Sequence, residues 1–344
     1  MHNCHKLSPF VHENIEILFN YYSRYKNSVE YKSILAPYAE TVPLRQGDLG
    51  FIDGVDVSNM RVKLLSSSYS IPKRLQAHRD GAVKLFKALG KIRKGNNGDW
   101  ENNQSARICD ADFQNKIITI SRAMYFDQVG TNLTSDWASG LLGGDELNTL
   151  RQVEPPQNGE LCNLRDSILA NTLGVAAVVV DRNKDMLIRI RGSEQAVMNA
   201  QGGRFHCSVS GVFELDESLS HGNLDFSEFS KGMTAEIRTE LNIDQNEYDL
   251  FPVAFSRELV RQGKPQLFFV IKTELTFDEI ENRARNAEEA WEFIDPTDIP
   301  ESNPLFPYLA SPGDAPTELF SFEGSMALAI VSSYLDGTIG PFRL

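Results

Sequence analysis

The sequence predicts an α/β protein of α+β-like character, divided into two domains. The chain has 344 residues, roughly twice the length of an average domain. Stretches with helical spacing of apolar residues are interspersed with short strand-like runs, an order typical of a mixed sheet. Around residues 151–165 (RQVEPPQNGELCNLR) the chain turns polar and carries a Pro-Pro pair, which stiffens the backbone. We therefore expect one domain over residues 1–160 and a second over residues 166–344.

Two helices and two strands are expected in the first half. Residues 14–37 place apolar side chains at helical spacing, and Pro37 supplies a stop. A second helix is expected over about 70–94, where lysines and arginines form a basic face. A Gly/Asn-rich loop then leads to two strand-like runs, 106–112 and 116–123, joined by a turn.

The segment that follows these strands, residues 125–137, combines polar and aromatic side chains, as the lining of a pocket would.

The second half alternates strands with helices. An apolar run, an Arg-Asn-Lys-Asp turn and an alternating run over residues 173–192 predict a β-hairpin. The other expected elements are a strand at 204–210, a helix at about 229–241, strands at 251–259 and 266–275, a helical piece at 277–292 and a closing helix at 325–335, capped by Ser325.

Charge and hydropathy exclude several classes of protein. With 34 basic and 47 acidic side chains the net charge is −13, which opposes a broad nucleic-acid surface because phosphate binding needs concentrated basic charge. No apolar stretch approaches the ~20 residues that span a bilayer. The four cysteines are scattered and lack CxxC spacing, so we expect reduced thiols. A cytoplasmic protein that does not bind membranes is the expectation.

Acidic residues in the helix at 229–241 are the strongest chemical signal. Glu236 and Glu240 are four residues apart, so their carboxylates lie on one face about one turn apart. Glu217, in the preceding loop, could bring a third carboxylate to them. Clustered carboxylates repel unless a cation neutralises them, and oxygen ligands favour Mg²⁺ or Mn²⁺. By spacing alone, a solvated helix with ordinary acidic residues remains an equal alternative.

The stretch 210–243 resembles the box of the Nudix hydrolase family, which reads G, five residues, E, seven residues, R-E-U-x-E-E-x-G-U, with U aliphatic. Six positions match: Gly211, Glu217, Glu236, Ile237, Glu240 and Ile243. The resemblance covers roughly residues 166–344. It implies a C-terminal Nudix-type α/β/α sandwich with a mixed sheet and says nothing about the first half. For that half, the helices and strands expected above predict a smaller α+β domain.

Several positions depart from that pattern. Ala235 stands where the family has arginine, and Thr239 replaces one of the paired glutamates. Seventeen residues instead of seven separate Glu217 from Ala235. Asn242 replaces a glycine, a mild change because asparagine tolerates the left-handed conformation common after a helix.

The resemblance implies metal-dependent hydrolysis of a nucleoside diphosphate-linked substrate of the nucleotide, ADP-ribose-like or nucleotide-sugar class. In this interpretation Glu236 is the water-orienting base and a metal neighbour, Glu240 is the principal metal ligand, and Glu217 supports it. The cofactor would be Mg²⁺ or Mn²⁺, which neutralises the diphosphate.

Other residues near the box could complete this site. Arg189, Arg191 and Arg204 could bind phosphate oxygens, and Gly211 would lie on the substrate side, although an arginine in such a place is more often a surface charge. The carboxylates that could replace the one lost at Thr239 are Glu214, Glu228, Glu288, Glu289 and Glu292.

Two further interpretations stay open. The fold could have lost its chemistry at Ala235 and Thr239 and act as a nucleotide-binding sensor or regulatory module. Alternatively, the chain could be a structural or interaction protein whose match to the Nudix box is accidental. In the enzyme interpretation, the N-terminal domain shapes the substrate pocket or forms a homodimer.

Overall fold

The computed structural model of the protein describes most of the chain from residue 60 to residue 337. The described ranges are 60–88, 90–95, 97–112, 114–137, 149–154, 161–192, 203–258, 261–316 and 319–337. The helix expected at 14–37 lies outside these ranges. Within them, no helix combines the length and the apolar character needed to cross a membrane.

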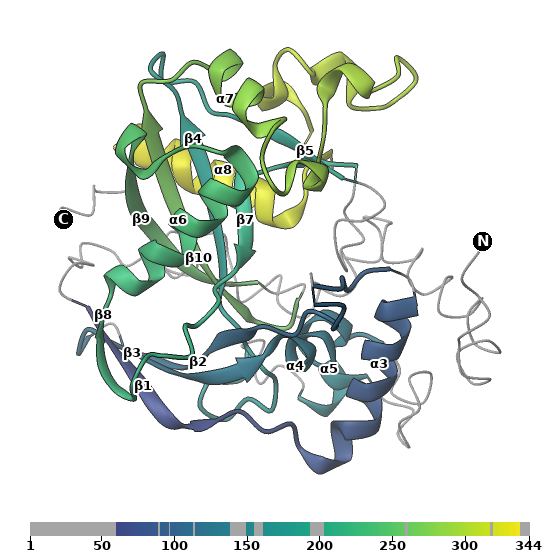
Figure 1. The fold of residues 1–344 in the computed structure, drawn as a ribbon, viewed down its shortest axis with the longest axis vertical. Helices are drawn as coiled ribbons and strands as arrows, with labels where there is room; N and C mark the ends of the chain where they lie inside the picture. Colours follow the sequence, from purple (N-terminus) through teal and green to yellow (C-terminus); the bar gives the residue numbers. More distant parts are fainter. Residues whose placement is uncertain are drawn as a thin grey trace.

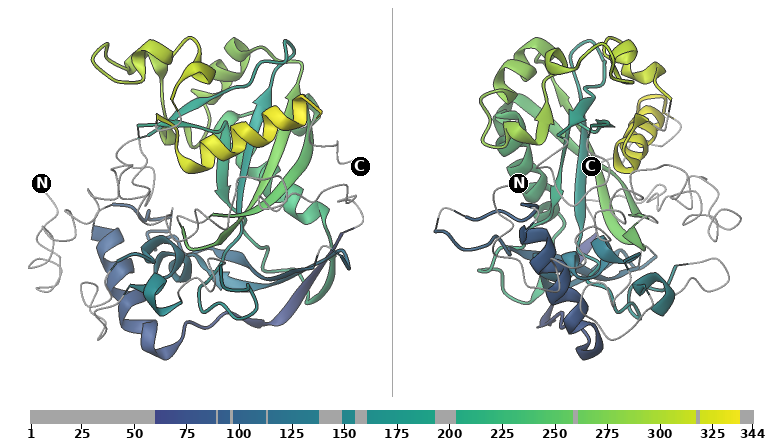
Figure 2. Two further views of the ribbon diagram at one scale, coloured as in Figure 1. Left: turned by 180° about the vertical axis from the view of Figure 1, so that it is seen from behind. Right: turned by 90° about the vertical axis from the view of Figure 1, so that its right-hand side faces the viewer.

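A four-stranded mixed sheet forms the centre of the second half. Its strands are β4 (Gly174–Val180), β7 (Val209–Val212), β9 (Tyr248–Glu258) and β10 (Lys264–Thr273), in the order β7-β4-β10-β9. Strands β4 and β10 are parallel, and the other pairs are antiparallel. Helix α6 (Ser227–Leu241) lies in front of this sheet in Figure 1. Helix α8 (Phe322–Leu335) covers the opposite face and crosses in front of the strands in the left view of Figure 2. The expected α/β class is confirmed, with a helix on each face of a mixed sheet.

A second four-stranded sheet, in the order β2-β3-β1-β8, is built from three strands of the first half and one strand of the second half, β8 (Gly222–Asp225). The strands expected at 106–112 and 116–123 are confirmed as β2 (Gln104–Asp112) and β3 (Ile117–Met124), and β1 (Arg61–Ser68) lies parallel to β3. The helix expected at 70–94 is shorter, with a 3-10 turn at Lys73–Leu75 followed by α3 (Gln76–Ala88).

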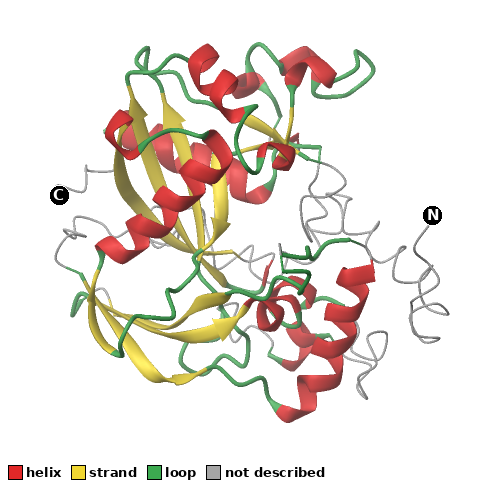
Figure 3. Cartoon of the chain, viewed as in Figure 1, coloured by secondary structure: helices red, strands yellow, loops and turns green. Residues whose placement is uncertain are grey.

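The short helices α4 (Tyr125–Val129), η5 (Asn132–Thr134) and α5 (Leu150–Val153) lie near α3, to the right of the strands in Figure 3.

The prediction of a hairpin over 173–192 is wrong for the second strand, which does not pair with β4 along its length. The turn forms, and Val180 bridges Met186. Strand β5 (Arg189–Arg191) then joins β6 (Phe205–His206) and β11 (Phe293–Ile294) in a third sheet. The physical reason is that both edges of β4 are already occupied, by β7 and by β10, so β4 has no edge left for a longer hairpin.

The other expected elements of the second half differ mainly at their ends. The run 204–210 divides into β6 and β7, and the helical piece at 277–292 divides into α7 (Phe277–Ala284) and the 3-10 turn η9 (Ala290–Glu292). Helix α8 begins earlier than expected, and its cap is Ser321, whose hydroxyl accepts from the Gly324 amide at 2.9 Å. Ser325 lies inside the helix and donates to the Phe322 carbonyl. Asn242 adopts the expected left-handed conformation after α6, with φ 54°.

The two large sheets share one hydrophobic core and are joined through the backbone. One cluster of buried side chains runs from β1, β2 and β3 to β4, β7 and β10. The outer edge of β2 is bonded to segments of the second half, through the Leu173 amide to the Ala106 carbonyl (2.8 Å) and the Leu215 amide to the Gln104 carbonyl (2.8 Å). This edge therefore fixes the start of β4 and the end of β7 against the first half.

The long spacing between Glu217 and Ala235 also has a structural role. Part of it forms β8 (Gly222–Asp225), which pairs antiparallel with β1 and becomes an edge strand of the N-terminal sheet. The remainder lengthens α6 at its N-terminal end, because the helix begins at Ser227. The insertion thus ties the start of α6 to the first half of the chain.

Candidate functional site

A cavity of about 200 Å³ is lined by residues from both halves of the chain. Helix α6, the segment after β7 (Glu214) and the segment 289–292 contribute carboxylates, while Arg191, Arg261 and Lys264 contribute positive charge. The first half contributes Arg93, Tyr125 and neighbouring side chains. The cavity therefore joins an acidic side to a cationic side.

The acidic side contains three carboxylates that could hold one cation. One oxygen each of Glu236, Glu240 and Glu289 lies within 4.8 Å of the others. The first two come from successive turns of α6. Glu289 is brought to that helix by its own amide, which donates to the Thr239 carbonyl at 2.9 Å. The predicted pair on α6 thus gains a third carboxylate from the late acidic segment.

Glu240 is completely buried, and only one of its two oxygens has a partner. Oε1 accepts from the Ser210 amide at 3.2 Å, whereas Oε2 has no hydrogen-bond partner among the described residues. Burial, together with the charges of Glu292 and Glu236, raises the pKa of Glu240 well above its ordinary value, and Arg189 opposes this. An unpartnered buried carboxylate oxygen is costly, and a cation would relieve that cost.

Glu236 is half-buried at the cavity wall, where it lies against Gly211 of β7. A Cβ at Gly211 would stand 2.0 Å from Glu236 Oε1, so only glycine leaves room for the carboxylate here. Burial and the nearby charges of Glu289, Glu292 and Glu214 raise the pKa of Glu236 well above its ordinary value. Gly211 lines the cavity as well, and its contact with substrate stays a prediction.

Arg93, from the loop after α3, reaches the acidic side across the cavity. Its Nη1 donates to Glu289 at 3.2 Å and its Nη2 to Glu292 at 3.4 Å. Its guanidinium also stacks on the ring of Trp291, with the carbon 3.4 Å from the ring centroid. The first half therefore supplies a charge partner to the carboxylates of the second half.

On the cationic side, a chain of hydrogen bonds fixes Arg191. Its Nη1 lies 2.6 Å from Nε2 of His206 and 3.3 Å from the Ser210 hydroxyl. Burial and the charge of Arg191 hold the pKa of His206 well below its ordinary value. The neutral ring therefore accepts from Arg191 at Nε2 and donates from Nδ1 to Ser321, the cap of α8. Arg191 Nε is buried and has no partner among the described side chains and backbone groups.

Lys264 lies close to Arg191 and Arg261 in this cavity. Its ammonium group is buried and donates to Gln266 at 3.0 Å, and Gln266 in turn donates to Glu323. Burial and the charge of Arg261 lower the pKa of Lys264 to about 8. These neighbouring cations are suited to an anionic group, because an added negative charge reduces their mutual repulsion.

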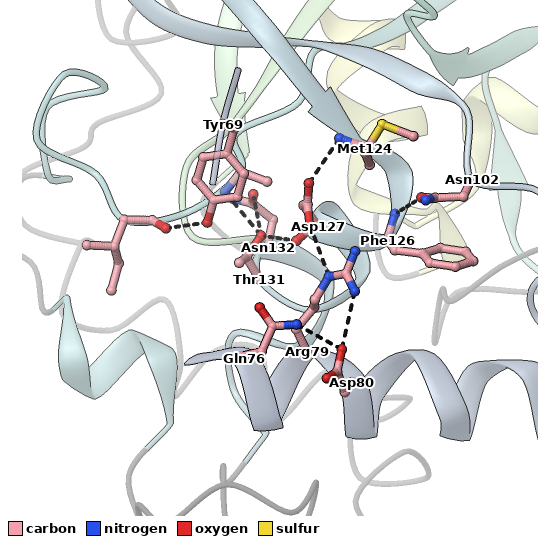
Figure 4. Close-up of polar contacts among 12 residues, drawn as sticks. Tyr69, Gln76, Arg79, Asp80, Asn102, Met124, Phe126, Asp127, Thr131 and Asn132 are labelled. Atoms are coloured by element: carbon pink, nitrogen blue, oxygen red, sulfur yellow. Dashed lines mark hydrogen bonds and ion pairs between the residues drawn. The ribbon is translucent and has the colours of Figure 1, made fainter. Parts of the chain in front are cut away.

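The wall from the first half is held by a polar network around Asp127. Figure 4 shows the Asp127 carboxylate accepting from Arg79 Nε of α3 (3.0 Å) and from the Met124 amide (3.0 Å). The Phe126 amide donates to Asn102 at 2.8 Å. These bonds position α4, whose Tyr125 lines the cavity. The expectation that 125–137 lines a pocket is therefore met by Tyr125, Gln128 and Leu133.

The structure brings together some of the predicted site residues and leaves others apart. Glu236, Glu289, Glu214, Gly211 and Arg191 line the cavity, and Glu240 completes the cation cluster beneath them. Glu214 also accepts from Asn103.

The other predicted residues lie elsewhere. Glu217 and Glu288 are exposed and outside the cavity lining. Arg189 is buried beside Glu281 (3.8 Å) and stacks on Phe293, and Arg204 donates to the Phe320 carbonyl at 3.3 Å. Glu228 pairs with Lys231.

Two of the departures from the box pattern are visible on α6. Ala235 is exposed, and the Thr239 hydroxyl donates to carbonyls of its own helix, those of Ala235 and Glu236, both at 3.2 Å. Neither supplies a ligand or a charge to the cluster.

The sequence alone did not identify Arg93, Arg261, Lys264 and Glu323 as site residues. Lys264 and Glu323 each lie at the start of a predominantly apolar element, and a charge in such a place is the one local signal that could have marked them.

Comparisons with known proteins add little to this geometry. No protein-family model matches the chain, and no curated protein matches it. Among solved structures, the crystal structure of DR0079 from Deinococcus radiodurans matches with a TM-score of 0.29 and 14% sequence identity. The match covers 51% of this chain and 97% of that one. A likeness this weak carries no argument, and the Nudix resemblance remains a prediction.

Proposed function

We propose that this protein is a metal-dependent hydrolase that cleaves the phosphoanhydride of a nucleoside diphosphate-linked substrate in the cavity between its two halves. The observation that carries the proposal is the group formed by Glu236, Glu240 and Glu289, together with the buried Oε2 of Glu240, which has no hydrogen-bond partner in the part of the chain that the structure describes. Burial and the charge of Glu289 raise the pKa of Glu236, and burial and the charges of Glu292 and Glu236 raise that of Glu240. The three carboxylates form a hard, oxygen-only donor set, which fits Mg²⁺ or Mn²⁺.

The cationic side supports a phosphorylated substrate. Arg191, Arg261 and Lys264 line the same cavity as Glu236, so one molecule could contact both sides. Arginine binds phosphate oxygens with a planar pair of donors, and Arg191 is held in place by His206. A substrate with adjacent phosphoryl groups matches this juxtaposition of charges.

In the proposed mechanism, different residues of the chain bind the cation, activate the water and bind the phosphate groups. A divalent cation at the three carboxylates would neutralise the diphosphate and lower the pKa of water. Glu236, which faces the cavity and has a raised pKa, orients the attacking water and takes up its proton. Arg191 and Lys264 hold phosphate oxygens and stabilise the charge that develops on them.

A product screen tests this proposal. Purified protein is incubated with Mg²⁺ or Mn²⁺ and with nucleoside triphosphates, ADP-ribose, dinucleotide cofactors, nucleotide sugars and dinucleoside polyphosphates, and products are identified by mass. We expect release of a nucleoside monophosphate or of pyrophosphate, lost in Glu240→Gln. Glu288→Gln is the matched control, because this neighbouring carboxylate is exposed and outside the cavity. Equal turnover by Glu240→Gln would refute the assignment.

The catalytically silent sensor remains the second candidate, and one observation favours it. The Thr239 hydroxyl is bonded to its own helix, so the cluster has fewer carboxylates than the box pattern supplies. This alternative predicts that a nucleotide stabilises the protein against heat without product formation, in proportion to RT ln(1 + [L]/Kd). Absence of stabilisation across the same panel would exclude it.

A further inference from the structure

Arg93 contacts two carboxylates of the acidic side at once, although it lies almost 200 residues away in the sequence. One guanidinium nitrogen donates to Glu289, which belongs to the cation cluster, and another to Glu292. The flat face of the same group stacks on Trp291, which lies between these two glutamates in the chain. Two hydrogen bonds and one stacking contact therefore fix the guanidinium plane.

The loop that carries Arg93 is itself fixed. The Arg93 carbonyl accepts from the Glu101 amide at 3.0 Å, and the next residue, Lys94, forms a β-bridge with Trp100. The adjacent Ile92 is buried in the apolar cluster beneath α3. The backbone at Arg93 is thus anchored in the first half, while its side chain acts in the second.

Basic side chains on α6 do not perform this task. Lys231 pairs with Glu228 at 2.6 Å, and Arg238 pairs with Asp244 at 2.6 Å, away from the cluster. Arg93 donates to both Glu289 and Glu292, and without it these two like-charged carboxylates would repel each other.

We propose that Arg93 is a positioning residue of the cation site: by holding Glu289 and Glu292 in a fork, the N-terminal half orients the carboxylate that α6 cannot supply. The inference rests on the proposed function, because it assumes that Glu236, Glu240 and Glu289 bind a cation. It makes the first half an integral part of the site.

The sign of one measurement separates this role from simple charge neutralisation. If Arg93 only compensates negative charge, its removal should tighten cation binding, because a competing positive charge disappears. If it orients Glu289, its removal should weaken binding, as loss of an outer hydrogen-bond partner does at metal sites, by roughly 10-fold to 100-fold.

The experiment measures Mn²⁺ affinity of the full-length protein by electron paramagnetic resonance of the free ion. We expect Arg93→Ala to weaken binding at least about tenfold. Arg93→Lys should recover only part of this loss, because an ammonium group keeps the charge but cannot fork between two carboxylates or stack as a plane. Arg238→Ala is the control, since it removes an arginine that pairs outside the cluster.

Arg93 is 39% exposed, so folding of both variants is expected, and circular dichroism and thermal unfolding verify it. A purely structural bridge between the halves would lower the melting temperature but leave Mn²⁺ affinity unchanged, and that outcome overturns the inference. Tighter binding by Arg93→Ala overturns it as well.

The same measurements separate this inference from the proposed function. If the wild-type protein binds no Mn²⁺ and shows no turnover, both the proposed function and the inference fail. Wild-type binding that Glu240→Gln abolishes and Arg93→Ala does not change would overturn the inference alone.

Discussion

Gly211→Ala is a perturbation whose size can be worked out from the structure. The added methyl carbon would stand 2.0 Å from Oε1 and 2.3 Å from Cδ of Glu236. Ordinary contact begins at 3.4 Å, so the carboxylate must retreat by about 1.4 Å, the difference between the two distances. The clashing atoms end a flexible side chain, so we expect the fold to survive while Glu236 leaves its place in the cluster. Misplacement of a catalytic group by about 1 Å costs roughly 100-fold in rate.

The assay compares metal-dependent turnover and Mn²⁺ affinity in wild type, Gly211→Ala and Gly313→Ala. Gly313 is the control because a Cβ there meets nothing within 4 Å and its φ is not positive. We expect about a 100-fold loss of turnover in Gly211→Ala, with weakened Mn²⁺ binding and a near-native unfolding curve. The control should match wild type within about 0.5 kcal/mol of stability. Wild-type turnover and affinity in Gly211→Ala would refute the placement of Glu236.

Three further predictions concern the fold and the charge cluster. Phe229→Ala should lower the free energy of unfolding by about 3–5 kcal/mol in urea, because Phe229 is buried edge-to-face with two other phenylalanines; a loss below about 1 kcal/mol would contradict this packing. Asn242→Ala should destabilise the protein by about 1 kcal/mol and Asn242→Gly should not, because φ is 54° there; equal effects would disprove the backbone argument. The pKa of Glu240 is raised, so the folded state holds its proton to higher pH than the unfolded state does. Without divalent cations, stability contributed by this group is therefore highest below the unfolded pKa of about 4.3 and falls as pH rises toward the folded pKa, by up to about 1.4 kcal/mol per pH unit. Urea unfolding from pH 4 to 8 should accordingly show Glu240→Gln gaining stability relative to wild type as pH rises, and a constant difference would contradict the assignment.

Local patterns were sufficient to predict most of the secondary structure. The alternation in 106–123 became the β2–β3 hairpin, and the apolar spacing of 229–241 became most of α6. The left-handed residue after α6 was also predicted, because the preference of asparagine for that conformation is local. Local patterns did not predict that β5 pairs in a third sheet and not with β4. That pairing depends on both edges of β4 being occupied by β7 and β10, which are distant in the sequence.

The candidate site shows the same division. Helical spacing alone placed Glu236 and Glu240 on one face, and the structure keeps them together. Glu289 was one of several acidic candidates, and no local feature distinguished it from Glu288. The hydrogen bond from the Glu289 amide to the Thr239 carbonyl brings Glu289 to α6 and leaves Glu288 exposed to solvent. No local sequence feature marked Arg93 as a site residue, because its role depends on contacts across the cavity with Glu289 and Glu292.

The insertion between Glu217 and Ala235 and the arginine from the first half, Arg93, have a common consequence. Strand β8, built from the insertion, attaches the start of α6 to the N-terminal sheet, while the outer edge of β2 holds the segments next to β4 and β7. Both attachments lie close in sequence to residues of the site. Gly211 belongs to β7, Glu214 follows that strand, and Glu236 belongs to α6. Movement of one half against the other would therefore change the distance between Arg93 and Glu289 directly. A cation site assembled across such a joint depends on the stability of both halves, which explains why a short local sequence pattern describes it incompletely.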